Sequence, residues 1–486
     1  MKVVLIDPPT SFEQIYGDWD LSAVDTYCPP LGLLHIASYV REHGHEPSVV
    51  DVTARKWTQQ KAVDFTLSMN PKVVGLFAKT INVHNAARIS DELRTKGFTG
   101  PIVSGGAHVT AVPAETLNRF QAFDYGVVGE GEVTFLELVE NLEQNGPVSN
   151  IRGLVWRNSL GEMVRNDPRP LIEDLDSLPL PAWDLLPNFP EGYPHSALET
   201  KRLPAASVIT SRGCPYQCSF CDTAIFGCRL RQHSAEYTLN MIRRLRETYG
   251  IKDLMFLDDN FILDRNKLFT ICNAMIEERM DLSWYCMGHA GILTEDRLKK
   301  VREAGCWFIE LGIESGFDRI LKLIKKNTTK AQVAEGVKNA RSAGLKVKGN
   351  FIFGFPTETL ETLEETIEFA ATIGLLHFQQ NFLTIWPGCE MAVEPEKYGA
   401  VEWDWQKLAH QRVTFIPNGL TEADLIEASK RAFRRFYLRP RIIFEVLVYS
   451  LTSWRAITNA FTAFAVFMRT ILRGGPDSAI GNHPHL

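Results

Sequence analysis

The sequence predicts an α/β protein with two parallel-sheet domains, and three observations support this prediction. Strand-like and helix-like segments alternate over residues 1–145 and again over residues 205–390. Such alternation is typical of parallel sheets with helices on their faces. A proline-rich stretch separates the two runs, and the alternation stops beyond residue 390. We therefore expect a Rossmann-like doubly wound domain (1–145), a hairpin and connector (146–204), a second β/α domain (205–390) and a helical region (391–486).

Composition and charge restrict the class of protein. At 486 residues, with 45% hydrophobic and 23% charged residues, the chain resembles an ordinary globular protein of two or three domains. Its net charge of −6 offers no basic surface to nucleic acid. Most of the nine cysteines are scattered singly, and no signal-peptide pattern or long uncharged apolar stretch occurs. We expect a cytoplasmic protein without a nucleic-acid partner.

The first domain alternates five predicted strands with five predicted helices. The strands are Lys2–Asp7, Ser48–Val52, Lys72–Phe77, Pro101–Ser104 and Asp124–Val128. The helices are Leu31–His43, Ala62–Met69, Val83–Thr95, Pro113–Phe120 and Val133–Asn145. Sheets of this kind bind ligands beyond the carboxyl ends of their strands. The loops at that edge contain glycines, which let the backbone approach a flat ligand, and polar residues: Thr10, Thr80, Gly105, Gly106, His108, Gly129, Glu130 and Gly131.

The connector begins with a predicted hairpin. Leu154–Trp156 and Met163–Arg165 flank Asn158-Ser-Leu-Gly161, a turn-forming segment. Prolines then accumulate up to Pro194. Because each proline fixes φ and removes a hydrogen-bond donor, we expect a stiff, mostly extended segment.

The second domain contains six predicted β/α units. An apolar run, Ala205–Thr210, precedes Cys214 as the first strand. The later strands are Leu254–Leu257, Ser283–Met287, Phe308–Ile313, Val347–Phe353 and Phe378–Ile385, with helices Asn266–Arg279, Thr294–Ala304, Lys330–Ala343 and Leu360–Gly374 between them. Catalytic groups of β/α barrels gather at the carboxyl ends of the strands.

Three closely spaced cysteines, Cys214, Cys218 and Cys221, follow the first of these strands. Thiolates this close can converge on one metal centre, and iron–sulfur clusters are normally held by four such ligands. Three local ligands would leave one iron of a four-iron cluster open to another molecule. The alternatives are ordinary cysteines or a zinc site with a distant fourth ligand. Zinc ligands usually occur as two close pairs, and no second close pair is present.

Polar residues also follow three later strands of this domain. They are Asp258, Asp259, Glu314, Ser315 and Gly354. Carboxylates and hydroxyls suit hydrogen bonds to a ribose, an amino group or a carboxylate. Any one of them taken alone is equally explained by turn chemistry at a strand end.

The pattern C-x3-C-x-aromatic-C, with Phe220 as the aromatic residue, resembles the cluster motif of radical S-adenosylmethionine (SAM) enzymes. The resemblance implies a partial (β/α)6 barrel, a [4Fe-4S] cluster held by the three cysteines, and SAM chelated to the open iron. It implies further SAM contacts at Phe220 and at the strand ends. Asp258 and Asp259 match the position near the methionine amino group. Glu314 and Ser315 match the ribose contact, and Gly354 matches the strand that lies along SAM.

The N-terminal domain resembles the cobalamin-binding domain of B12-dependent radical SAM enzymes, most closely at Gly105–Thr110 and Val127–Glu132. The resemblance implies that the loop residues from Thr10 to Gly131 named above contact cobalamin. Many B12 domains place a histidine on cobalt through Asp-x-His-x-x-Gly, but the first loop here, Asp7–Phe12, has none. We expect cobalt without a histidine ligand. We also expect His108 to line the pocket, although a solvated loop histidine is the alternative.

The C-terminal region lacks the strand–helix alternation of the rest of the chain. Glu422–Tyr437 is a predicted helix capped by Thr421, with arginines and aromatic residues near its end. Two apolar segments follow, Ile442–Leu451 and Ile457–Leu472, and residues Gly475–Leu486 are predicted to be disordered. We expect helices over the barrel mouth, and peripheral contact with a membrane surface is the alternative.

The resemblance implies a cobalamin-dependent radical SAM enzyme, and we interpret it first as a methyltransferase of class B. One SAM would methylate cob(I)alamin, and another would yield a 5′-deoxyadenosyl radical that removes hydrogen from an unactivated carbon. The substrate radical would then capture the methyl group of methylcobalamin.

Two other functions stay open at this point. One is an oxidative cyclase or rearrangement enzyme similar to the anaerobic Mg-protoporphyrin monomethyl ester cyclase. The other is a non-catalytic regulator that binds SAM and B12, although a regulator needs no complete cysteine triad. The expected partners are a small-molecule substrate, which the apolar C-terminus suggests is large and hydrophobic, and an electron donor such as flavodoxin or ferredoxin.

Overall fold

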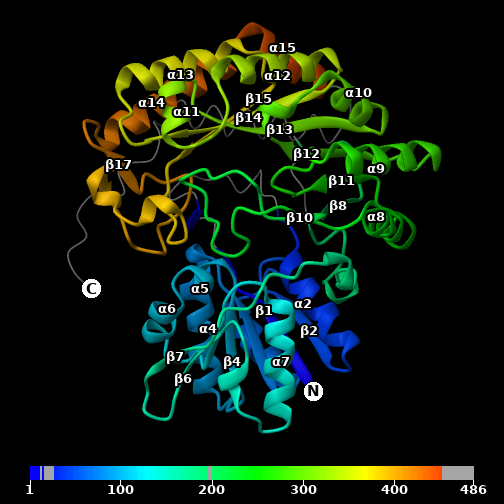
Figure 1. The fold of residues 1–486 in the computed structure, drawn as a ribbon, viewed down its shortest axis with the longest axis vertical. Helices are drawn as coiled ribbons and strands as arrows, with labels where there is room; N and C mark the ends of the chain where they lie inside the picture. The colour runs from blue at the N-terminus through cyan, green and yellow to red at the C-terminus, as the bar shows by residue number, and fades with distance from the viewer. Residues whose placement is uncertain (11–13, 16–26, 194–198, 451–486) are drawn as a thin grey trace.

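The computed structural model describes residues 1–10, 14–15, 27–193 and 199–450. Two lobes lie one above the other, with the N-terminal domain below and the second β/α domain above (Figure 1). The predicted α/β class with two parallel sheets is confirmed. The predicted segments Ile457–Leu472 and Gly475–Leu486 lie outside the described residues.

The N-terminal sheet has seven strands in the order β2-β1-β3-β4-β5-β6-β7. Strands β1 to β5 are parallel, whereas β6 and β7 pair antiparallel. The predicted hairpin therefore extends the sheet of the first domain instead of standing apart in the connector. The strands are β1 (Lys2–Asp7), β2 (Glu46–Asp51), β3 (Val73–Phe77), β4 (Ile102–Gly105), β5 (Tyr125–Val127), β6 (Leu154–Arg157) and β7 (Met163–Arg165).

Helices cover both faces of this sheet because successive side chains of a strand point to opposite faces. In β1, Val3 and Leu5 pack with α2 and α7, whereas Val4 and Ile6 pack with α3 and α4. The helices are α2 (Leu31–Glu42), α3 (Gln59–Ser68), α4 (Val83–Thr95), α5 (Ala107–Ala111), α6 (Pro113–Arg119) and α7 (Gly131–Glu143). The short α5, directly after Gly106, was not predicted from the sequence.

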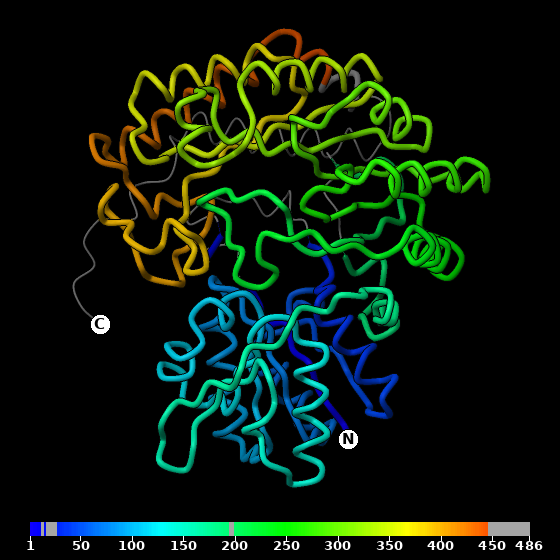
Figure 2. The backbone as a smooth tube through the Cα atoms, viewed as in Figure 1, coloured from blue at the N-terminus to red at the C-terminus, as the bar shows by residue number. Residues whose placement is uncertain are grey.

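The connector crosses from the first domain to the second along the molecule (Figure 2). Over the described residues 166–193 it contains only short 3-10 turns, Leu175–Ser177 and Trp183–Leu185, as the prolines predict. Trp183 and Tyr193 are buried and join the main hydrophobic core. These aromatic anchors pack the connector against the folded domains.

The second domain is a partial barrel of six parallel strands in the order β15-β14-β13-β12-β11-β8. The strands are β8 (Ala205–Val208), β11 (Asp253–Phe256), β12 (Ser283–Gly288), β13 (Cys306–Glu314), β14 (Lys346–Phe353) and β15 (His377–Phe382). The helices are α8 (Ala235–Tyr249), α9 (Arg265–Glu277), α10 (Glu295–Glu303), α11 (Asp318–Leu323), α12 (Lys330–Ser342) and α13 (Leu360–Thr372). A two-residue pair, β9 (Ser211–Arg212) with β10 (Arg231–Gln232), brackets the cysteine loop.

The C-terminal region departs from the prediction in two ways. Residues before α14 form a small antiparallel pair, β16 (Gly399–Val401) with β17 (Phe415–Pro417), rather than helices. The helix α14 (Glu422–Tyr437) does not cover the barrel mouth but packs beside α13 and β15 on the outer layer (Figure 1). Its apolar face is buried there, and Arg431 and Arg435 pair with glutamates of α13. The last described helix is α15 (Pro440–Ser450).

The segment between β16 and β17 returns to the N-terminal domain. Trp405 is buried, and Leu408 lies beside it in the hydrophobic core of that domain. Arg88 of α4 donates a hydrogen bond to Gln406. Within the described ranges, no helix combines the length and apolar character needed to cross a membrane.

Candidate active site

The three cysteines lie on a loop that leaves β9 and returns in β10. Gly213, the first residue of this loop, has φ of 80°, and an added Cβ would collide with the Arg229 carbonyl oxygen. Only glycine fits there, because L side chains rarely adopt this conformation and no space exists for one. The loop is therefore closed tightly at its base while the cysteines extend away from it. We refer to residues 213–230 as the cluster loop.

The thiols of this loop are partly shielded from water. Burial raises the pKa of all three thiols, and that of Cys221 rises to about 12. Among the described residues, no three His, Cys, Asp or Glu side chains are arranged to hold a single metal ion. In a four-iron cluster each thiolate binds a different iron atom, so the sulfurs need not meet at one point. The donor set suits iron, since three cysteines supply the soft ligands that clusters require.

A buried ion pair stands beside the cluster loop. Lys326 Nζ donates to Glu314 Oε1 at 2.7 Å, and both side chains are buried. Burial opposes the charge on Lys326, but Glu314 and the Cys218 thiol raise its pKa above the ordinary value. The lysine therefore carries a permanent positive charge next to the cysteines.

Glu314 also has an unusual backbone. It has φ of 68° where the register between β13 and β14 shifts. Non-glycine residues in this conformation are uncommon and concentrate at ligand sites. The structure thus turns the carboxylate of Glu314 out of the strand pattern and toward Lys326.

The two aspartates after β11 have different surroundings. Asp258 is fully buried, and its Oδ1 accepts from the Thr210 backbone N–H at 2.9 Å and from the Thr210 hydroxyl at 3.0 Å. Asp259 instead lines the cavity described below, and its charge acts on Cys214 and Cys221. Of the pair, Asp259 is the one placed to meet a ligand, whereas Asp258 holds the backbone before the cluster loop.

Two further predicted SAM residues, Ser315 and Gly354, are both buried. Ser315 is fully buried, and its hydroxyl accepts from the Phe317 backbone and contacts the Thr366 hydroxyl. Gly354 has φ of 96°, and the Glu358 carboxylate accepts from its N–H at 2.6 Å. Burial raises the pKa of Glu358 to about 8. The Ser315 hydroxyl therefore holds the backbone that follows Glu314, whereas Gly354 ends β14 in a backbone conformation that favours glycine, beside Leu425 and the Phe415 carbonyl.

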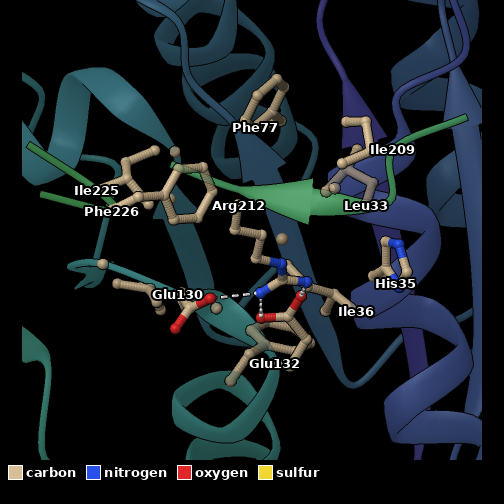
Figure 3. Close-up of a pocket in the computed structure, with 18 of the residues that line it drawn as sticks. Leu33, His35, Ile36, Phe77, Glu130, Glu132, Ile209, Arg212, Ile225 and Phe226 are labelled. Carbon is tan, nitrogen blue, oxygen red and sulfur yellow. Dashed lines mark hydrogen bonds and ion pairs between the residues drawn. The ribbon is translucent and has the colours of Figure 1, made fainter. Parts of the chain in front are cut away.

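A cavity of about 230 Å³ lies between the N-terminal sheet, α2 and the base of the cluster loop (Figure 3). Its walls are mostly apolar, and Leu33 and Ile36 of α2 and Phe77 of β3 point into it. Gly106 has φ of 113°, and an added Cβ would meet the Phe77 ring at 2.7 Å. Five predicted cobalamin residues line this cavity: Gly105, Gly106, Gly129, Glu130 and Gly131. Glycine loops beside apolar walls suit one part of a large, flat cofactor, because about 230 Å³ is less than the volume of a whole cobalamin.

The other three predicted cobalamin residues lie elsewhere. His108 is buried, its ring lies 4.2 Å from the Trp405 ring, and its Nδ1 is 3.2 Å from the Thr80 hydroxyl. Burial lowers the pKa of His108 to about 3. His108 is not among the lining residues of the two cavities described here, but it contacts Thr80, which lines the second one. Its expected place in the cobalamin pocket stays a prediction. Thr10 is half-buried and precedes residues outside the described ranges.

A second cavity, of about 420 Å³, lies where the two lobes meet. Lys79 and Thr80 reach it from the first domain, and Cys221 reaches it from the cluster loop. The rest of its wall comes from the barrel and the segment after it, and includes Ile352, Leu383, Thr384, Trp386 and His410. A molecule bound here would touch both domains at once.

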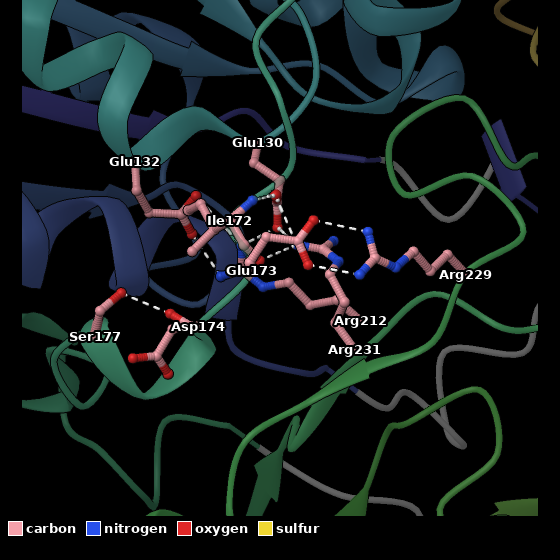
Figure 4. Close-up of polar contacts among 9 residues, drawn as sticks. All are labelled: Glu130, Glu132, Ile172, Glu173, Asp174, Ser177, Arg212, Arg229 and Arg231. Carbon is pink, nitrogen blue, oxygen red and sulfur yellow. Dashed lines mark hydrogen bonds and ion pairs between the residues drawn. The ribbon is translucent and has the colours of Figure 1, made fainter.

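Sequence reasoning missed a buried ionic network that joins these two regions (Figure 4). Arg212 donates to Glu130 Oε1 and to Glu132 Oε1, each at 2.6 Å. Arg231 donates to Glu130 Oε2 at 2.9 Å and to the Ile172 carbonyl at 2.6 Å. The available signal was the repeated Gly-Glu of residues 129–132 together with an arginine on each side of the cysteine motif. Lys326 and Trp405 were also missed.

Two family models match the chain. The model described as the B12 binding domain matches residues 20–139, and the model of the radical SAM superfamily matches residues 208–370. The two matches fall on the two lobes, and the second one includes the cluster loop.

Relatives match over most of the chain. An uncharacterized methyltransferase of Pyrococcus horikoshii is 33% identical over 454 residues, which cover 92% of this chain and 94% of the relative. The anaerobic magnesium-protoporphyrin IX monomethyl ester cyclase of Rubrivivax gelatinosus is 25% identical over 449 residues, covering 90% of this chain and 78% of the relative. The cobalamin-dependent S-adenosylmethionine radical enzyme OxsB, solved with aqua-cobalamin and S-adenosylmethionine bound, shares the fold. Its TM-score is 0.72 at 17% identity, covering 95% of this chain and 72% of OxsB.

Proposed function

We infer that this chain, which belongs to the radical SAM enzymes with a B12-binding domain, methylates an unactivated carbon of a small-molecule substrate. Its cofactors are a [4Fe-4S] cluster, SAM and cobalamin. When bound, the cluster and SAM supply a 5′-deoxyadenosyl radical, and cobalamin supplies the methyl group. The protein must hold these groups and the substrate in line, because proximity and orientation govern the transfer.

The residues with the proposed cofactor roles fall into three groups. Cys214, Cys218 and Cys221 would hold the cluster. Phe220, Asp259, Glu314 and Gly354 would contact SAM, with Asp258 and Ser315 fixing the backbone around it. The glycine loops at 105–106 and 129–131 would hold cobalamin. Lys326 would balance the negative charge of the thiolates, since its ammonium is buried beside them.

The observation that supports methyl transfer most directly is the 420 Å³ cavity between the lobes. Thr80 of the B12-binding domain and Cys221 of the cluster loop both line it. A substrate in this cavity would contact the two places where the radical and the methyl group are expected. Ile352, Leu383 and Trp386 make part of its wall apolar, which supports a substrate with a hydrophobic portion.

Several finer points belong to this proposal. An electron donor such as flavodoxin or ferredoxin would reduce the cluster, and the exposed Cys221 offers it access to the cluster loop. A cytoplasmic location suits the nine cysteines, all of which have free thiols. In the described part of the C-terminal region, contact with a membrane surface is supported by the exposed Leu438, Ile443 and Phe444, whereas the apolar face of α14 is buried.

Oxidative cyclisation is the second candidate function. Its support is the 25% identity to the magnesium-protoporphyrin ester cyclase over 90% of this chain. Such a reaction consumes SAM for the radical alone. A non-catalytic regulator is disfavoured, because sensing does not need the complete cysteine triad.

The test uses anaerobically reconstituted, reduced enzyme with cobalamin and SAM that carries a deuterated methyl group. A small-molecule extract serves as the source of substrate. The methyltransferase proposal predicts 5′-deoxyadenosine, S-adenosylhomocysteine and a product that contains the labelled methyl group. Formation of 5′-deoxyadenosine with an unlabelled, oxidised product would establish the cyclase instead.

A further inference from the structure

Two arginines face each other at the base of the cluster loop. Arg212 in β9 and Arg231 in β10 are register partners in the antiparallel pair. Like charges directly opposite each other destabilise a strand pair. These two strands contain only two residues each, so few other interactions hold the base of the loop together.

A carboxylate from the other domain lies between these arginines (Figure 4). Glu130 Oε1 accepts from Arg212 at 2.6 Å, and Glu130 Oε2 accepts from Arg231 at 2.9 Å. The connector joins the same carboxylate, since the Ile172 backbone N–H donates to Glu130 Oε2 at 2.7 Å. Glu132 completes the arrangement by accepting from Arg212 at 2.6 Å.

The network is buried and electrically balanced. The side chains of Arg212, Glu130, Glu132 and Arg231 are 9%, 3%, 5% and 3% exposed. Two guanidinium groups meet two carboxylates, so no net charge remains. Removing one partner of such a group leaves a buried, uncompensated charge, which is strongly unfavourable. The arginines therefore keep their positions only while the loop at 129–132 stays docked.

The loop that supplies the carboxylates also lines the cofactor cavity. Gly129 and Gly131 flank Glu130 along that cavity, and Arg212 immediately precedes Gly213 and Cys214. Any displacement of residues 129–131 by a ligand is thus transmitted through one carboxylate to both ends of the cluster loop.

We propose that Glu130 is a positioning residue through which cobalamin binding in the first domain stabilises the cluster loop in the second. The inference rests on the proposed cobalamin site but not on the reaction that the enzyme catalyses. Because coupling between two sites is reciprocal, bound cobalamin should make the protein hold the cluster more tightly, and the bound cluster should make it hold cobalamin more tightly. Glu132 supports this connection from the first domain, and Arg231 supports it from the second.

The test measures how fast a ferrous chelator removes iron from the reconstituted full-length chain, with and without saturating hydroxocobalamin. In the unaltered chain, hydroxocobalamin should slow iron loss at least about fivefold. Glu130→Gln keeps the shape of the side chain and removes its charge, and it should bring this ratio close to one. The matched control is Glu173→Gln, which breaks the exposed pair between the connector and Arg229 of the same loop. This control should keep the ratio of the unaltered chain.

A merely structural role would give a different result. Iron would then leave the Glu130→Gln variant faster with and without hydroxocobalamin, and an unchanged ratio would overturn the proposal. So would an unaltered chain in which hydroxocobalamin gives no protection. If Glu130→Gln does not fold or does not load cobalamin, Arg231→Gln decides by the same ratio, since it breaks the connection from the barrel side. No methylated product is needed, so failure of the proposed methyl transfer would leave this test intact.

Discussion

Lys326 and Glu314 form a buried ion pair, with 2.7 Å between Nζ and Oε1, although eleven residues of loop and helix separate them in the chain. The pair links Glu314 at the end of β13, the proposed ribose contact, to the positive charge of Lys326 beside the cysteines. Glu314 thus has two tasks, because it balances Lys326 and, in our proposal, accepts hydrogen bonds from SAM.

Glu314→Gln is therefore expected to weaken SAM binding about 10- to 100-fold, the range for a lost hydrogen bond to a charged group. Formation of 5′-deoxyadenosine should fall with it, while cobalamin stays bound. Equilibrium binding of SAM and product quantification check this prediction. Glu390→Gln is the control, because it breaks the exposed pair with the neighbouring Lys325. SAM affinity that is equal in the two variants would remove Glu314 from the binding site.

Alanine at Cys214, Cys218 and Cys221 together is expected to abolish the oxygen-sensitive cluster, because these thiols are its proposed protein ligands. Iron and sulfide analysis with electron paramagnetic resonance measures the loss after anaerobic reconstitution. Cys228→Ala removes an exposed thiol of the same loop and should leave the iron content unchanged. A triple variant that still holds four irons would contradict the assignment.

Cobalt is expected to have no histidine ligand from this chain's first loop or from His108. The His108 ring packs against Trp405, and its Nδ1 contacts the Thr80 hydroxyl, so these two residues hold the ring in place. The electron paramagnetic resonance spectrum of bound cob(II)alamin should lack nitrogen superhyperfine splitting from the lower face. His108→Ala should leave this spectrum unchanged. Nitrogen splitting that disappears in the variant would show that His108 reaches cobalt.

Glu358 is expected to make stability depend on pH. Burial raises its pKa from the ordinary value of 4.5 to about 8, so the folded state holds a proton that the unfolded state releases between these values. Its stabilising contribution is complete below pH 4.5 and is lost as the pH rises to about 8.

Relative to Glu358→Gln, the unaltered chain should therefore lose unfolding free energy between pH 5.5 and 8, by at most about 1.4 kcal/mol per pH unit. Urea unfolding at several pH values measures the difference. Glu361→Gln, at an exposed position of α13, should show the same pH dependence of the unfolding free energy as the unaltered chain. A difference for Glu358→Gln that does not vary with pH would mean that the carboxyl is ionised throughout.

Trp405→Ala is expected to destabilise the first domain by about 3 kcal/mol, the cost of emptying a buried aromatic site. Trp405 lies in the core of that domain, and Arg119 stacks 4.6 Å above its ring. Thermal and urea unfolding followed by fluorescence would detect the loss. Trp403→Ala, two residues earlier and 39% exposed, should change stability by no more than about 0.5 kcal/mol. Equal effects of the two substitutions would contradict the packing role.

The features of the fold that the sequence predicted well are local ones, because strand alternation reads directly as a parallel sheet. Cys214, Cys218 and Cys221 stand within eight residues, so their assignment to a cluster also rests on local sequence, and it stays a prediction. Contacts between distant segments left no such pattern. A lone Lys326 or Trp405 looks like any surface lysine or core tryptophan until the fold places it.

One departure from the prediction has a specific physical cause. The hairpin of β6 and β7 was recognised, but its attachment depended on the free edge of β5, which no local pattern reveals. The place of His108 in the cobalamin pocket stays a prediction. Its ring lies beside Trp405, a contact between distant segments that the local sequence does not reveal.

The return of Trp405 to the first domain has a mechanical consequence. The chain leaves that domain through the connector and comes back to it near α5 and α6, so the Glu130 network and the Trp405 contact hold it at two separate places. Both contacts add to a hydrophobic core that includes Leu34 of the first domain and Leu254 of the barrel. Any movement of one lobe against the other therefore has to break buried packing at several places at once.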